Sequence, residues 1–144
     1  MNDIISDQIK ILVIEDDFFA VKVATMILEK KGCLVDCVST GKEAMQREMS
    51  DYNLILLDLG LPDVDGFEVA KFIRRRYGHT GLPIVILTAH EDDEKVELAK
   101  ELGVNDFFLK PFTQEKADLL LTQFMFSNKS NKHSTGDIML NGSL

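Results

Sequence analysis

Residues 54–66 read LILLDLGLPDVDG. The first four residues are all apolar, which is typical of a strand buried on both faces of a sheet. Asp58 follows at once, and the Gly, Pro and Asp residues of positions 60–66 indicate a loop. This stretch therefore predicts a buried strand that carries a carboxylate at its carboxyl end.

Short apolar runs alternate with longer amphipathic stretches on both sides of this segment. Strands are expected at residues 9–14, 34–38, 54–57, 84–87 and 107–109. Helices are expected at residues 18–31, 41–49, 66–77, 91–102 and 113–125. The regular βα alternation predicts an α/β protein with a parallel sheet and crossover helices.

The length and the change in composition near the carboxyl end suggest one domain and a tail. The 144 residues suit a single domain, expected at residues 1–126. Residues 127–144 are rich in Ser, Asn, Lys and Gly, which predicts a mostly disordered tail.

The charge and hydropathy of the chain exclude several classes of partner. The formal net charge of −8 repels phosphate backbones and anionic membranes, so we expect no direct binding to nucleic acid or membrane. No apolar run reaches the roughly 20 residues of a transmembrane helix. Residues 1–8 lack the basic start of a signal peptide, so the expected location is the cytoplasm.

Polar residues stand at the ends of the expected strands, where ligands collect in an open parallel sheet. They are Glu15, Asp16, Asp58, Thr88 and Lys110. Three converging carboxylates either take up protons or hold a cation, and hard oxygen ligands favour Mg²⁺. A lysine and a hydroxyl beside them suit phosphoryl oxygens. The set therefore predicts phosphoryl transfer to a carboxylate, with Asp58 as the nucleophile.

Residues 10–126 resemble the receiver domain of two-component response regulators. Four motifs match the family in order: ILVIEDD at 11–17, LILLDLGLPDVDGFEV at 54–69, IVILTA at 84–89 and FFLKPF at 107–112. Any one of them is a weak signal, but together they are highly specific. The expected fold is therefore a doubly wound, five-stranded parallel (βα)5 sheet with the flavodoxin-like strand order 2-1-3-4-5.

The resemblance implies a donor, a metal and a set of metal ligands. A histidine kinase or a histidine phosphotransfer protein would donate its phosphoryl group to Asp58. Asp16, Asp58 and the backbone carbonyl of Gly60 would hold Mg²⁺, and Glu15 would act mostly through water.

The resemblance also implies a switch. Thr88, the backbone N–H of Ala89 and Lys110 would receive the phosphoryl oxygens. Thr88 and Phe107 would then move inward and change the surface formed by residues 91–125. The bond between Lys110 and Pro111 would be cis, which X-Pro bonds tolerate.

Three positions depart from common family patterns. Phe107 stands where many relatives have Tyr, so packing alone would drive the switch. Gly60 and His90 occupy the places where side chains gate the hydrolytic water. We hypothesise that Gly60, which has no side chain, leaves the water path open and makes the acyl phosphate short-lived.

The function that we expect is a phosphorylation-controlled switch and not an enzyme on a separate substrate. The alternatives are a receiver-like adaptor that signals without phosphate, a phosphatase with an Asp nucleophile, and a flavin-binding redox protein. The chain would be a single-domain regulator or the receiver of a hybrid kinase. Its downstream protein target stays open, and it would be a monomer or a phosphorylation-dependent dimer.

Several charged residues have simpler structural interpretations. We expect Asp17 to cap the helix that follows it, and Asp63 and Asp65 to belong to a loop. Arg74, Arg75 and Arg76 would form a solvated helix end, where cations suit the helix dipole.

Overall fold

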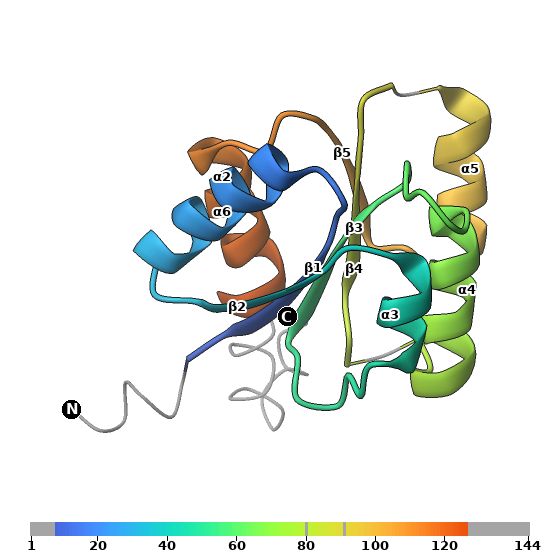
Figure 1. Cartoon of the computed structure of the whole chain (residues 1–144), viewed down its shortest axis with the longest axis horizontal. Helices are drawn as coiled ribbons and strands as arrows, with labels where there is room; N and C mark the ends of the chain where they lie inside the picture. Colours follow the sequence, from blue (N-terminus) through green and yellow to red (C-terminus); the bar gives the residue numbers. More distant parts are fainter. Residues whose placement is uncertain (1–7, 80, 91, 127–144) are drawn as a thin grey trace, which may run out of the picture. The chain divides into compact units, whose positions relative to one another are not determined.

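The computed structural model describes residues 8–79, 81–90 and 92–126, in which five strands alternate with helices (Figure 1). The elements are β1 (Lys10–Ile14), α2 (Phe18–Lys30), β2 (Leu34–Val38), α3 (Gly41–Gln46), β3 (Leu54–Asp58), α4 (Gly66–Tyr77), β4 (Ile84–Thr88), α5 (Asp93–Glu101), β5 (Asp106–Leu109), α6 (Gln114–Leu120) and the π-helix η1 (Leu121–Phe126). The expected tail, residues 127–144, lies outside the described residues.

The chain divides into two compact units. The first, Met1–Thr113, contains the sheet and helices α2 to α5, and the second, Gln114–Leu144, contains α6 and η1. In the described part of the chain no helix is both long and apolar enough to cross a membrane.

All five strands are parallel and follow the order β2-β1-β3-β4-β5, which confirms the expected fold. The register pairs Ile14 with Leu57, and Asp58 with Leu87. Because parallel strands end at the same edge of a sheet, the residues that follow these positions meet there.

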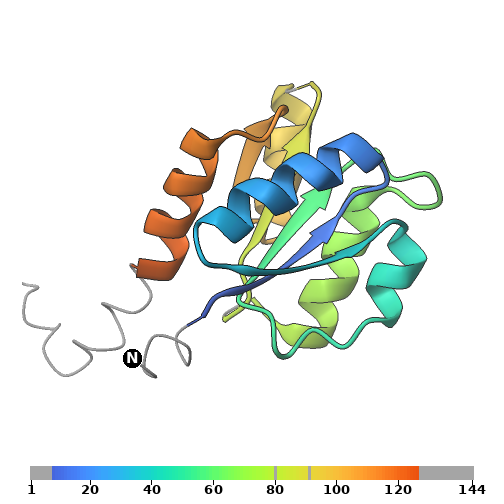
Figure 2. The same ribbon diagram turned by 60° about the vertical axis from the view of Figure 1, so that its left-hand side comes forward.

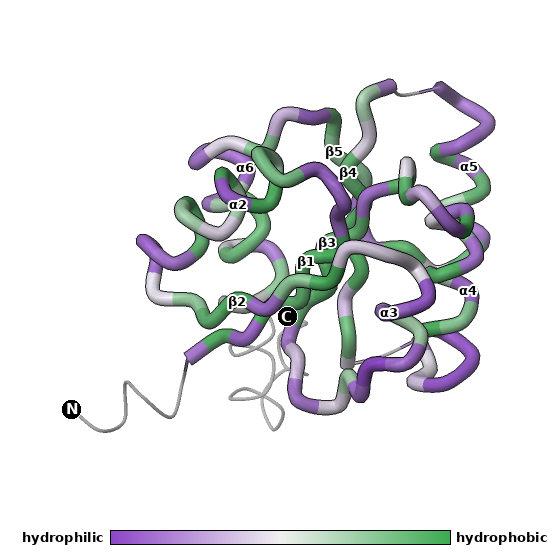
Figure 3. The backbone as a smooth tube through the Cα atoms, viewed as in Figure 1, coloured by the Kyte–Doolittle hydropathy of each residue, from purple (hydrophilic) through white to green (hydrophobic). Residues whose placement is uncertain are grey.

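The two faces of the sheet are covered by different helices, as in a doubly wound fold (Figure 2). Helix α2 lies over one face through Ala24 and Leu28, and α3, α4 and α5 lie over the other. Both β3 and β4 are buried along their whole length. Figure 3 shows the hydrophobic residues concentrated along the strands and hydrophilic residues on the outer turns of α4 and α5.

Four helices differ from their expected bounds, of which α2 ends only one residue early, at Lys30. Helix α3 ends at Gln46, because the backbone N–H of Met49 donates to the Tyr77 hydroxyl at 2.9 Å while the Met49 side chain is buried in the core. Helix α5 starts at Asp93, after Asp92 caps it. The helix expected at residues 113–125 is an α-helix only over α6, and the chain then continues as the π-helix η1.

The loop after Asp58 is held by the residues that the sequence assigned to a turn. The Asp63 carboxylate accepts hydrogen bonds from the backbone N–H groups of Gly41 and Lys42, at 2.8 and 2.9 Å. A Cβ on Gly66 would lie 2.8 Å from the backbone of Leu59, so only glycine allows α4 to start this close to the end of β3. These contacts fix the path of the chain beside Asp58.

The arginine run at the end of α4 corrects one expectation, because Arg74 is buried and not solvated. Its guanidinium donates to the backbone carbonyls of Gly103, Gly78 and Leu82 and to Asn105 Oδ1, all at 2.9–3.0 Å. Burial lowers the pKa of Arg74 from its usual value, but an arginine remains charged. The side chain therefore joins α4 to the turns before β4 and β5.

We predict that Arg74→Met lowers the free energy of unfolding by about 3 kcal/mol, because several buried acceptors lose a charged donor at once. Urea unfolding followed by circular dichroism measures this change. Arg75→Met is the matched control, since Arg75 is exposed on the same helix turn and should cost less than about 0.5 kcal/mol. Equal losses in the two variants would contradict the structural role of Arg74.

Candidate functional site

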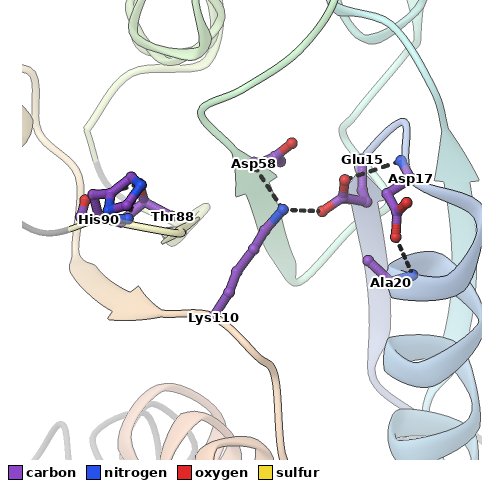
Figure 4. A network of polar contacts seen from close by, with 7 residues as sticks. All are labelled: Glu15, Asp17, Ala20, Asp58, Thr88, His90 and Lys110. Carbon is purple, nitrogen blue, oxygen red and sulfur yellow. Dashed lines mark hydrogen bonds and ion pairs between the residues drawn. The ribbon is translucent and has the colours of Figure 1, made fainter.

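The Asp58 carboxylate lies at the carboxyl edge of the sheet and forms an ion pair with Lys110 (Figure 4). Asp58 Oδ1 is 3.0 Å from Lys110 Nζ, and the Asp58 side chain is only 6% exposed. Asp58 ends the central strand β3, while Lys110 follows β5 and reaches past the end of β4. The peptide bond between Lys110 and Pro111 is cis. Strands far apart in sequence thus bring a buried carboxylate and a cation together.

Glu15 forms the second ion pair of Lys110. Glu15 Oε1 is 3.0 Å from Lys110 Nζ, and Glu15 Oε2 accepts a hydrogen bond from the backbone N–H of Asp17 at 3.0 Å. Burial, with a smaller contribution from the charge of Asp58, raises the pKa of Glu15 above its usual value despite these two partners. Both oxygens of the Glu15 carboxylate are therefore already engaged.

Lys110 stays charged because two carboxylates face it. Burial by itself would lower the pKa of Lys110, but the ion pairs with Glu15 and Asp58 outweigh burial and raise the pKa above its usual value. The ammonium group is thus a fixed positive charge between the ends of β1 and β3.

A cluster of three carboxylates can hold a small divalent cation. One ligand oxygen each from Glu15, Asp16 and Asp58 lies within 4.8 Å of the others, and Asp16 is exposed. Mg²⁺ typically binds one or two protein carboxylates and keeps several waters. Because Glu15 already contacts Lys110 and Asp17, the oxygens best placed for a metal are those of Asp16 and Asp58. The residues therefore fit Mg²⁺ by charge, ligand type and spacing.

The hydroxyl of Thr88 is used by the turn that follows β4. Thr88 Oγ1 donates to the backbone carbonyl of His90 at 3.0 Å and accepts from the His90 N–H at 3.3 Å. Figure 4 shows Thr88 and His90 on the opposite side of Lys110 from Glu15. Thr88 is buried, and its hydroxyl is already engaged by this turn.

A single cleft brings five of the residues selected from the sequence together. Asp58, Gly60, Thr88, Ala89 and Lys110 line a cleft of about 290 Å³. A phosphoryl group has room there beside the Asp58 carboxylate. Glu15 and Asp16 lie on the other side of Asp58, within the carboxylate cluster.

Phe107 lies away from this cleft, on the α5 side of the sheet. Its partly buried ring packs against the core and lines a cavity of about 240 Å³ together with Val96 and Ala99 of α5. The cavity gives the ring space to move.

Sequence reasoning missed Lys95, which also lines the cleft over Asp58. Lys95 lies in the first turn of α5, and its exposed side chain looks like an ordinary surface lysine in the sequence. The available signal was its position, because the helix after β4 starts at the same sheet edge as Asp58.

Asp17 has the structural role that we expected. Its carboxylate accepts a hydrogen bond from the backbone N–H of Ala20 at 2.8 Å and caps α2. It is not part of the metal cluster.

Comparison with known proteins identifies relatives of several kinds. The chain is 34% identical over 133 residues to the osmosensing histidine protein kinase SLN1 of Saccharomyces cerevisiae, covering 88% of this chain and 11% of that protein. It is 34% identical over 107 residues to the transcriptional regulatory protein CpxR homolog of Haemophilus influenzae, covering 74% and 46%. The chain thus spans less than half the length of these two curated relatives.

A solved structure with the same fold is the chemotaxis protein CheY4 of Vibrio cholerae. It is 25% identical, with a TM-score of 0.75, and the match covers 82% of this chain and 99% of that one. The family profile described as "Response regulator receiver domain" matches residues 11–121. By this match and by its fold, the chain belongs to the response regulator receiver domains of two-component systems.

Proposed function

We propose that Asp58 accepts a phosphoryl group from a phosphohistidine of a histidine kinase or histidine phosphotransfer protein. The observation that carries this proposal is the placement of Lys110 Nζ 3.0 Å from Asp58 Oδ1, beside a three-carboxylate cluster. A nucleophile, a fixed cation and a metal site are the groups that phosphoryl transfer to a carboxylate needs.

In the proposed reaction, an Asp58 carboxylate oxygen attacks the phosphorus of the phosphohistidine. A P–O bond forms, the P–N bond breaks, and the imidazole nitrogen leaves with the electron pair of that bond. Lys110 then contacts a phosphoryl oxygen in place of its present contact with Asp58 Oδ1. Ala89 and Thr88 line the same cleft. The backbone N–H of Ala89, and the hydroxyl of Thr88 once it leaves the His90 backbone, would supply further donors.

Asp16, Asp58 and the backbone carbonyl of Gly60 would hold Mg²⁺ in this proposal. When bound, Mg²⁺ offsets the negative charge that the phosphoryl group brings to the carboxylate cluster. Glu15 would act through water, which agrees with the two partners that its carboxylate already has.

The proposed switch starts at Thr88. Its hydroxyl must leave the His90 backbone to reach a phosphoryl oxygen, which draws the end of β4 toward Asp58. Phe107 pairs with Ile86 of β4 in the sheet register and borders a cavity beside α5. Movement at Thr88 would therefore pass to Phe107 and then to the surface of α5.

Exposed apolar side chains on α2 support a protein as the phosphoryl donor. Phe18, Phe19 and Met26 are 64%, 74% and 62% exposed, and the two phenylalanine rings meet edge to face. Large exposed apolar groups next to a reactive site are typical of a surface that binds another protein. A histidine kinase takes its phosphoryl group from a nucleoside triphosphate, which is present in the cytoplasm. The cytoplasm is therefore the location that fits this partner.

The chain would act as a switch on its own modification and not as an enzyme on a separate substrate. An adaptor that signals without phosphate would need no phosphoryl chemistry. Burying the charged groups of Glu15, Asp58 and Lys110 costs desolvation free energy, and an adaptor would not require this cluster. The relatives include a histidine kinase and a transcriptional regulatory protein. The proposal therefore covers both a receiver within a hybrid kinase and a receiver of a response regulator.

We predict that Asp58→Ala abolishes phosphorylation. The wild-type protein, incubated with acetyl phosphate and Mg²⁺, should gain the mass of one phosphoryl group in intact mass spectrometry. Asp51→Ala, which removes an exposed loop carboxylate before β3, should still gain it. Phosphorylation of the Asp58→Ala variant would remove Asp58 from its proposed role.

A second prediction concerns the metal. Asp16→Asn should lower the apparent affinity for Mg²⁺ in the phosphorylation reaction by about ten-fold or more, because one anionic ligand is lost. The rate of phosphorylation by acetyl phosphate, measured against Mg²⁺ concentration, gives the apparent affinity. Asp17→Asn is the control, since asparagine caps a helix as well as aspartate does and Asp17 lies outside the cluster. Equal Mg²⁺ curves for both variants would argue against Asp16 as a ligand.

A third prediction concerns the lifetime of the acyl phosphate. A Cβ on Gly60 would lie 3.8 Å from Asp58 Oδ2, which is ordinary contact, and Gly60 does not have a positive φ, so a side chain fits there. Gly60→Gln should lengthen the half-life about five-fold, or about 1 kcal/mol in activation free energy, by obstructing the attacking water. Gly60→Ala is the control with a Cβ alone. A half-life in Gly60→Gln no longer than in Gly60→Ala would contradict an open water path at Gly60.

A further inference from the structure

Lys95 of α5 is among the residues that line the cleft at Asp58. The cleft of about 290 Å³ is lined by Lys95 as well as by Asp58, Thr88 and Lys110. Two lysines from different elements therefore border the space that a phosphoryl group on Asp58 would fill: Lys110 after β5 and Lys95 on α5.

The backbone of Lys95 is fixed although its side chain is exposed. The Lys95 backbone N–H donates to the Asp92 carboxylate at 2.9 Å, which places Lys95 in the first turn of α5. Over the described ranges, no carboxylate lies within ion-pair distance of the Lys95 ammonium. Lys100 on the same helix differs, because it pairs with Glu97 at 3.7 Å.

Charge balance at the site favours a contact of Lys95 with a group added to Asp58. In the structure Lys110 already forms ion pairs with two carboxylates, those of Glu15 and Asp58. A phosphoryl group carries about −1.5 to −2 charges near neutral pH and replaces the single charge of Asp58. Together with the carboxylates of Glu15 and Asp16 this makes about −3.5 to −4, which exceeds the charge of about +3 that Lys110 and a bound Mg²⁺ would supply. A lysine stem is long and flexible, so the ammonium of Lys95 can turn toward the added oxygens without a change in the fold.

We propose that Lys95 is a second phosphoryl-binding cation, which pairs with the oxygens on Asp58 from the α5 side and links the first turn of α5 to the phosphorylated site. The inference rests on the proposed function of Asp58. It adds a direct connection between the phosphoryl group and α5, separate from the path through Thr88 and Phe107. Ala99 is the one buried residue of α5, so little packing opposes a shift of its first turn.

Beryllofluoride with Mg²⁺ is the probe, because it mimics a phosphoryl group on a carboxylate and its binding is an equilibrium. Its affinity can be measured by calorimetry or fluorine NMR for the wild type and for Lys95→Gln, Lys95→Arg and Lys100→Gln. Lys95→Gln should bind about two- to five-fold more weakly at low salt, as expected for a partly exposed ion pair. The difference should shrink at high salt, and Lys95→Arg should restore most of the affinity.

Hydrogen exchange provides a second readout. In the wild type, beryllofluoride should protect the amides in the first turn of α5, and in Lys95→Gln this added protection should be lost. Lys100→Gln removes the same charge from the same helix and should behave as the wild type.

Three outcomes would overturn the inference. The first is a Lys95→Gln variant with the same beryllofluoride affinity and amide protection as the wild type. The second is an equal loss of affinity in Lys95→Gln and Lys100→Gln, which would indicate an effect of net charge alone. The third is a wild-type protein that binds no beryllofluoride, and this result would also remove the proposed function. The first two results leave the proposed function standing, so the two failures are distinguishable.

Discussion

The ammonium group of Lys110 between Glu15 and Asp58 is the interaction on which the site depends. Parallel pairing of β1 with β3 places these two carboxylates side by side at one edge of the sheet, where they repel each other. The 3.0 Å contacts of Lys110 with both of them offset this repulsion and hold the Asp58 carboxylate in place.

The scaffold around this ion pair is rigid on one side and loosely held on the other. Asp58 ends a strand that is buried throughout, and the loop after it is held by Asp63 and by the close approach at Gly66. Helix α5 buries one residue, Ala99, and borders a cavity next to Phe107. Elements with few buried contacts are those that move most readily, so a charge added at Asp58 acts first on the α5 side.

Arg74 limits how far such a movement can extend. Its four hydrogen bonds join the end of α4 to the turns before β4 and β5, at the opposite end of the strands from Asp58. The amino ends of β4 and β5 are therefore fixed while their carboxyl ends, with Thr88 and Lys110, face the cleft. This arrangement lets the site change locally without loosening the sheet.

The sequence by itself determined the strands and the polar residues at their ends, because a strand buried on both faces must be apolar and a site at its end must be polar. The order of the strands followed from the resemblance to receiver domains and not from the apolar pattern. It also indicated the cap at Asp17, since the chemistry of a cap is local, whereas Asp65, which we expected in a loop, caps α4 in the structure. Only the tertiary structure decided that Arg74 is buried, that the Thr88 hydroxyl faces His90, and that Lys95 borders the cleft. The burial of Arg74 and the place of Lys95 depend on contacts between segments distant in sequence, and the local pattern of an arginine run or a surface lysine is the same whether or not such contacts form. The Thr88–His90 contact is local, but a residue pattern does not determine which rotamer a strand-end threonine adopts.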